Sequence, residues 1–129
     1  MSDPARVLGK RVLLVDDDEG ARESIKLLLS IDRHTVTLAK NGLEALKKFH
    51  PDLLDLVIID YFMPQMQGIE LAANLKLMAP SLPILMVTAY SEKLGNTPNP
   101  VDAVLDKPFG IAELRQAVAK LMNPDLTMT

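Results

Sequence analysis

The sequence predicts an α/β protein in which helices cover both faces of a parallel β-sheet. Short, continuously apolar runs alternate along the chain with longer segments in which apolar residues recur every three or four positions. A continuous apolar run is typical of a strand buried on both faces, and a 3.6-residue period is typical of an amphipathic helix. Strands that alternate with helices favour right-handed crossovers, and these place neighbouring strands parallel.

Five segments are predicted to be strands. They are Val12–Val15, Thr35–Ala39, Leu56–Ile59, Ile84–Val87 and the shorter Ala103–Leu105. The second alternates polar and apolar residues, so we expect it to be half exposed, whereas the first, third and fourth are apolar throughout.

Four helical stripes follow the first, second, third and fifth strands. Their apolar positions are Ala21, Ile25, Leu28 and Leu29; Ala45, Leu46 and Phe49; Leu71, Leu75 and Met78; and Ile111, Leu114, Val118 and Leu121. Asn41, with Glu44 three residues later, predicts the start of the second helix, and Pro51 its end.

The segment Ser91–Pro100 departs from this pattern. The alternation predicts a helix there, but the segment holds one glycine, two prolines and two asparagines, which oppose helix formation. We therefore expect this fourth helix to be weak or short, with at most one turn near Ser91–Leu94.

Composition bounds the class of protein. The 129 residues are 48% hydrophobic and 24% charged, which predicts one globular domain, 1–129, with a core at about 10–122 and a polar tail at 123–129. No cysteine and only two histidines argue against thiolate or histidine metal sites and against a cysteine nucleophile. The net charge of −3 argues against direct nucleic-acid binding. A cytoplasmic location, with no membrane association, is expected.

Polar side chains stand at the carboxyl ends of four predicted strands. Asp16–Asp18 follow the first strand, Asp60 the third and Lys107 the fifth, while Thr88 follows the fourth. Ligands of open parallel sheets bind at this edge. An all-oxygen set of carboxylates suits Mg²⁺, a lysine and a hydroxyl can hold phosphate oxygens, and an aspartate can itself become phosphorylated. Asp18 is expected to cap the first helix instead.

Four segments together resemble the CheY-like receiver domain of two-component response regulators. They are VLLVDDD, LVIIDYFMPQMQG, ILMVTAY and LDKPF, and they cover the chain in the family's order from about Lys10 to Met122. The resemblance implies a doubly wound, flavodoxin-like sheet of strand order 2-1-3-4-5. It also implies a cis peptide bond between Lys107 and Pro108.

The resemblance assigns a role to each site residue. Asp60 would accept a phosphoryl group from a sensor histidine kinase or a histidine phosphotransfer protein. Asp17 would bind Mg²⁺, or Mn²⁺, directly and Asp16 through water, with the backbone carbonyl of Phe62 as a further ligand. Such a domain catalyses only its own phosphorylation and dephosphorylation.

Four further positions follow from the same resemblance. Thr88 would bond a phosphate oxygen, and Lys107 would pair with the phosphate or with Asp60. The aromatic residue that receivers usually carry three positions before the lysine is Val104 here. Tyr90, like Phe62, flanks the phosphoryl site and is a large aromatic residue.

Three functions from different classes stay open at this point. The first is a phosphorylation-switched signalling module that acts on an unknown downstream protein. The second is a constitutive interaction module with the same fold, which Val104 and the weak fourth helix favour. The third is a metal-dependent phosphatase or mutase, which normally needs a cap domain and a second general acid, and neither is found in the sequence.

Overall fold

The computed structural model describes residues 6–89 and 100–123, and all statements about the fold concern these residues. Five parallel strands form one sheet in the order β2-β1-β3-β4-β5, as predicted. The strands are β1 Arg11–Val15, β2 Thr35–Ala39, β3 Leu56–Asp60, β4 Ile84–Thr88 and β5 Ala103–Asp106. Each prediction was right to within one residue at either end.

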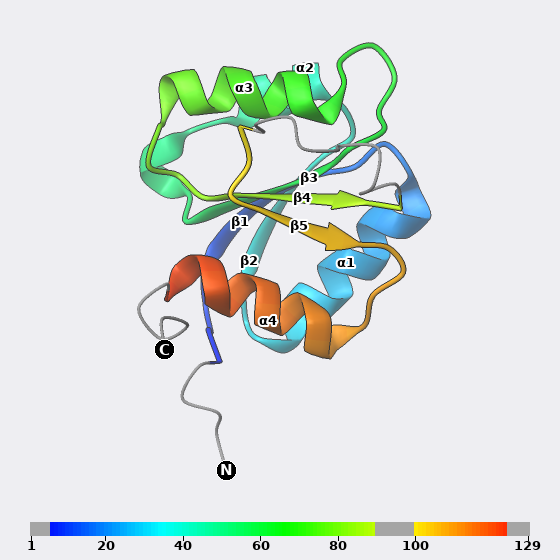
Figure 1. The fold of residues 1–129 in the computed structure, drawn as a ribbon, viewed down its shortest axis with the longest axis vertical. Helices are drawn as coiled ribbons and strands as arrows, with labels where there is room; N and C mark the ends of the chain where they lie inside the picture. Colours follow the sequence, from blue (N-terminus) through cyan, green and yellow to red (C-terminus); the bar gives the residue numbers. More distant parts are fainter. Residues whose placement is uncertain (1–5, 90–99, 124–129) are drawn as a thin grey trace.

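Helices lie on both faces of this sheet. They are α1 Glu19–Ile31, α2 Gly42–Lys48, α3 Gly68–Met78 and α4 Ile111–Met122, with a 3₁₀ turn, η1, at Pro51–Leu53. Figure 1 shows α2 and α3 on one face and α1 and α4 on the other. The weak or short helix expected between β4 and β5 falls in 90–99, outside the described residues, so α4 is the last helix that the structure describes.

Side-chain caps fix the starts of the first two helices. Asp18 Oδ2 accepts a hydrogen bond from the Ala21 amide at 2.9 Å, so the expected cap of α1 is present. Asn41 Oδ1 accepts from the Glu44 amide at 2.8 Å, and Glu44 Oε1 reaches back to the Lys40 amide at 3.3 Å. These caps satisfy amide groups that a helix leaves without partners in its first turn.

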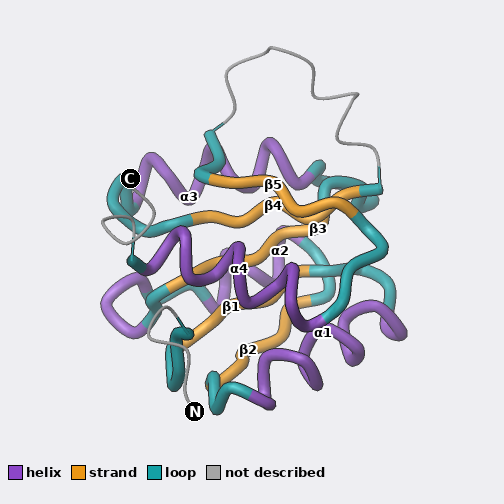
Figure 2. Tube along the Cα trace, turned by 60° about the horizontal axis from the view of Figure 1, so that its bottom comes forward, coloured by secondary structure: helices purple, strands orange, loops and turns teal. Residues whose placement is uncertain are grey.

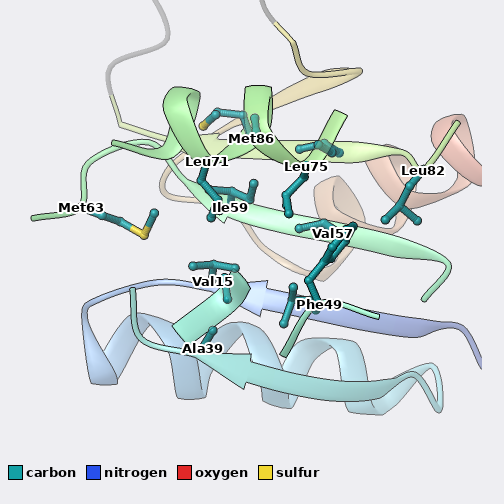
Figure 3. Close-up of a cluster of buried hydrophobic side chains, with 14 residues drawn as sticks. Val15, Ala39, Phe49, Val57, Ile59, Met63, Leu71, Leu75, Leu82 and Met86 are labelled. Carbon is teal, nitrogen blue, oxygen red and sulfur yellow. The ribbon is translucent and has the colours of Figure 1, made fainter. Parts of the chain in front are cut away.

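Two apolar clusters, one on each face, hold the layers together. The cluster under α2 and α3 joins alternate residues of the central strands to Ala45, Leu71 and Leu75, and its packing is drawn in Figure 3. The cluster under α1 and α4, the two helices in front in Figure 2, includes Ile25 and Leu114. Because β1, β3 and β4 contribute to both clusters, they are apolar and buried along their length, except for exposed Arg11 at the start of β1 and the polar residues Asp60 and Thr88 at the ends of β3 and β4.

One predicted core position was wrong. Met78 follows the apolar stripe of α3 but is 53% exposed, because α3 ends at that residue and the chain turns away at Ala79.

In the described part of the chain, no helix has the length and apolarity needed to cross a bilayer.

The residues before β1 form a docked arm. Arg6 donates hydrogen bonds to the Asp32 carboxylate, and the Gly9 amide donates to the Asp32 carbonyl at 2.9 Å. Val7 is buried in the cluster under α1 and α4. This arm therefore packs on the turn between α1 and β2 and on the last helix.

Candidate functional site

The parallel strands bring the predicted site residues to one edge of the sheet. Asp16 directly follows β1, Asp60 is the last residue of β3 and Thr88 the last of β4, while Lys107 directly follows β5. The strand arrows in Figure 1 all end at this edge. The Lys107 amide donates to the Thr88 carbonyl at 2.8 Å, so the backbone that carries the lysine is fixed to the end of β4.

Three carboxylates lie together at this edge. One oxygen each of Asp16, Asp17 and Asp60 lies within 4.8 Å of the others. Asp16 and Asp60 are buried, whereas Asp17 is exposed at the rim. Asp16 Oδ1 accepts a hydrogen bond from the Asp18 amide at 2.9 Å, which fixes the orientation of its carboxylate.

Lys107 is the cation of this cluster. Its Nζ lies 3.2 Å from Asp60 Oδ1 and 3.5 Å from Asp16 Oδ2. Burial lowers the pKa of Lys107, but the charges of Asp16 and Asp60 outweigh it, so the net shift is upward. The lysine therefore stays charged at neutral pH and holds the two buried acids together.

Asp60 titrates far from its usual range. Burial, followed by the charge of Asp16, raises the pKa of Asp60 to about 6, although Lys107 acts in the opposite direction. Burial also raises the pKa of Asp16. One ammonium does not neutralise three carboxylates, so the site favours a further cation. Oxygen donors at this spacing suit a hard divalent metal such as Mg²⁺.

The loop after β3 carries Phe62 two residues beyond Asp60. Both ends of the loop are fixed by backbone hydrogen bonds, from the Tyr61 amide to the Val87 carbonyl at 2.9 Å and from the Gly68 amide to the Tyr61 carbonyl at 3.0 Å. A Cβ at Gly68 would collide with the Asp60 carbonyl oxygen, so only glycine fits there. The Phe62 ring is 44% exposed and stacks edge-on against Tyr61.

The remaining predicted positions are Thr88, Val104, the Lys107–Pro108 peptide bond and Tyr90. Thr88 is almost fully buried at the end of β4, and Val104 is 38% exposed on the edge strand β5. The Lys107–Pro108 peptide bond is cis, as predicted. Tyr90 lies outside the described residues.

Sequence reasoning missed Arg22. Its Nη1 donates to the Asp16 backbone carbonyl at 2.8 Å and so supports the turn that carries the acids. The available signal was its position four residues after the Asp18 cap, which places it one turn above the acidic turn on α1.

The doubly wound sheet, with acids and a lysine at the carboxyl ends of its strands, is typical of a domain that signals by phosphorylation. Comparison with known proteins identifies its family. Residues 12–119 match the profile of the response regulator receiver domain. The chain belongs to this family. It is 37% identical over 116 residues to the response regulator MprA of Mycobacterium ulcerans, and the match covers 88% of this chain and 50% of that protein. The chain therefore spans about half the length of the curated relatives it matches.

Solved structures agree with this assignment. The response regulator TrrA of Thermotoga maritima, crystallised with Mg²⁺ and BeF, is 36% identical with a TM-score of 0.80, over 87% of this chain and 98% of that one. TrrA in complex with the histidine kinase ThkA is also 36% identical, with a TM-score of 0.78, over 88% of this chain and 99% of that chain.

Proposed function

We propose that this receiver domain accepts a phosphoryl group on Asp60 from the phosphohistidine of a sensor histidine kinase or of a histidine phosphotransfer protein. An Asp60 carboxylate oxygen forms the new bond to phosphorus, and the phosphorus–nitrogen bond breaks with its electron pair returning to the imidazole ring. The convergence of Asp16, Asp17 and Lys107 on Asp60 carries this proposal. The kinase complex of the relative TrrA supports the choice of donor.

The same site would hold Mg²⁺, with Mn²⁺ as a substitute. Asp17 and Asp60 supply carboxylate oxygens, Asp16 acts through water, and the Phe62 carbonyl completes the protein ligands. The bound ion would neutralise charge on the transferred group. Burial, followed by the charge of neighbouring Asp16, raises the pKa of Asp60 to about 6, and this buried cluster of acids supports a cation there.

Thr88 and Lys107 would hold the phosphoryl oxygens after transfer. Lys107 already lies 3.2 Å from Asp60 and would exchange that contact for one to the phosphate. Thr88, at the end of the adjacent strand, would report the transfer to β4. With these groups the domain would catalyse only its own phosphorylation and dephosphorylation.

The signal would pass to a downstream protein by contact with the altered surface, without direct nucleic-acid binding by this domain. The curated relatives are about twice as long as this chain. Any downstream effect that a longer protein of this kind would have is therefore also part of this proposal. A cytoplasmic location remains a prediction. The constitutive module is not favoured, since the family match, the kinase complex of a relative and the convergence of the acids and the lysine on Asp60 all support transfer.

A small phosphodonor with Mg²⁺ tests the proposal. Acetyl phosphate should add one phosphoryl group to the wild-type chain, detected by intact mass, and Asp60→Asn should abolish it. Asp52→Asn, which removes an exposed aspartate in η1, is the matched control and should be phosphorylated like wild type. No adduct would favour the constitutive module, and steady turnover of organic phosphates would favour the phosphatase.

A further inference from the structure

Gly42 and Met66 make an unusually close contact between α2 and the loop after β3. A Cβ built on Gly42 would lie 2.7 Å from Met66 Sδ and 3.0 Å from Met66 Cβ, closer than side chains normally pack. Gly42 is the first residue of α2 and is buried, and Met66 packs against the apolar cluster under α2 and α3. The loop therefore rests directly on the backbone of α2.

Space, and not backbone freedom, explains the glycine at this position. Among the described glycines only Gly9 has a positive φ, so the backbone of Gly42 is one that any residue adopts. The feature that an alanine could not accommodate is the side chain of Met66.

Met66 is one of two side chains that hold the middle of this loop. The loop ends are fixed through Tyr61 and Gly68, and between them Met63 is buried in the same apolar cluster, as Figure 3 shows. Gln65, beside Met66, has φ 70°, in the left-handed region that a non-glycine residue occupies only when its surroundings impose it. The Met66 amide donates to the Pro64 carbonyl at 2.8 Å and closes a tight turn at Gln65, so the loop bends sharply just before the side chain that rests on Gly42.

We propose that Met66, resting on Gly42, is a positioning residue that fixes the loop and so aims the backbone carbonyl of Phe62 at the metal position. Phe62 lies between the fixed Tyr61 and the buried Met63, so its carbonyl direction depends on where the loop's apolar contacts place the chain. This inference rests on the proposed function of the site, and it adds a contact on α2 that no strand-end residue provides.

A double-mutant cycle on the full chain tests the contact. Gly42→Ala should weaken Mg²⁺ binding, measured by calorimetry with the metal alone, by about five- to tenfold, because the new methyl displaces Met66. In a Met66→Ala background the same change should alter the dissociation constant by less than about twofold, since little remains to be displaced. Gly20→Ala is the matched control, because the nearest atom to its Cβ, Asp18 Oδ2, is 3.7 Å away.

Amide exchange of the metal-free protein provides a readout that does not depend on the ion. Met66→Ala should speed exchange of the Gly68 amide, which donates to the Tyr61 carbonyl across the loop, at least about fivefold, while the β4 amides keep their protection. Met66→Ala shortens a side chain and creates no steric clash. It therefore tests the positioning role of Met66 even if Gly42→Ala does not fold.

Three results would overturn the inference. They are equal Mg²⁺ affinity in Gly42→Ala and wild type, an equal loss in both Met66 backgrounds, or unchanged exchange in Met66→Ala. A wild-type chain that binds no Mg²⁺ would contradict the proposed function instead, and the exchange comparison would still decide the position of the loop.

Discussion

Lys107 Nζ lies 3.2 Å from Asp60 Oδ1 and 3.5 Å from Asp16 Oδ2, so one ammonium group bridges the ends of β1 and β3. The two acids and the lysine come from three different strands, and only the sheet brings them together. The bridge leaves the cluster with excess negative charge, and we expect this charge, together with the burial of the acids, to lower the stability of the metal-free domain at neutral pH.

The first prediction concerns stability without metal. Asp60→Asn should raise the free energy of unfolding at pH 7 by about 1–3 kcal/mol, because the pKa of Asp60 is about 6 in the fold against 3.8 unfolded. A raised carboxyl pKa means that the native state binds more protons than the unfolded state between these values. Wild-type stability therefore falls as the pH rises from about 4 to 6, and Asn removes this loss.

Urea titrations from pH 4 to 7, with and without Mg²⁺, measure this effect. The advantage of Asp60→Asn should vanish towards pH 4 and should narrow when Mg²⁺ stabilises the wild type. Asp52→Asn removes the same charge outside the cluster and is the control. A less stable Asp60→Asn at pH 7 would contradict the crowded acid pocket.

The second prediction concerns the metal ligand at the rim. Asp17→Asn should abolish Mg²⁺-dependent phosphorylation by acetyl phosphate while leaving the fold intact, because Asp17 is exposed and its carboxylate belongs to the acid cluster. Adduct formation by mass and the far-UV spectrum measure the two properties. Phosphorylation at the wild-type rate would show that the metal assignment is wrong.

The third prediction concerns the lifetime of the phosphorylated state. Hydrolysis needs a water molecule in line with the bond between Asp60 and phosphorus. By resemblance to the family, Phe62 and Tyr90 flank the path by which this water approaches. Both are aromatic residues at positions where a polar side chain could orient the water. Phe62→Asn with Tyr90→Glu should therefore speed loss of the adduct by roughly tenfold or more.

The decay is followed by mass after the phosphodonor is removed. Phe109→Asn, which changes a partly buried aromatic residue beyond Pro108, serves as a control for general loosening. Unchanged or slower decay in the double mutant would mean that both rings serve a partner surface instead.

The fourth prediction concerns Asp32 at the end of α1. It is 3% exposed, and its carboxylate accepts hydrogen bonds from Arg6 and from Arg115 of α4. Although burial raises the pKa of Asp32, the two arginines outweigh it and hold the pKa below its usual value. The stabilisation is thus present above about pH 4 and is lost as the pH falls through the lowered pKa.

Asp32→Ala should lower the melting temperature at pH 7 by about 5 °C or more. Asp55→Ala, which breaks the more exposed pair with Arg11, should lower it less. Equal effects of the two substitutions would contradict the anchoring role of Asp32.

Most of the architecture could be predicted because apolar periodicity encodes it directly. The strands were placed to within one residue, and the cap at Asn41 was found because its partners lie three or four residues apart. Met78 was misplaced, because periodicity does not show where a helix leaves the sheet. The acids, Thr88 and Lys107 were expected at one edge of the sheet because each stands at a strand end, and they lie at that edge in the fold.

The missing parts depend on contacts between distant segments. The support of Asp16 by Arg22, the pairing of Asp32 with Arg115 and the fit of Met66 on Gly42 join residues whose proximity no local pattern encodes. The raised pKa of Asp60 likewise needs the burial and the distances that only the folded chain provides.

The docked arm before β1 has a consequence for where this domain should be delimited. The family profile begins at residue 12, inside the first strand, yet Arg6 and Val7 already belong to the packed structure. A recombinant fragment trimmed to the profile would lose a buried valine and one of the two arginines that neutralise Asp32. We therefore expect a fragment that begins upstream of Arg6 to be more stable than one that begins at residue 12, where the match to the family profile starts.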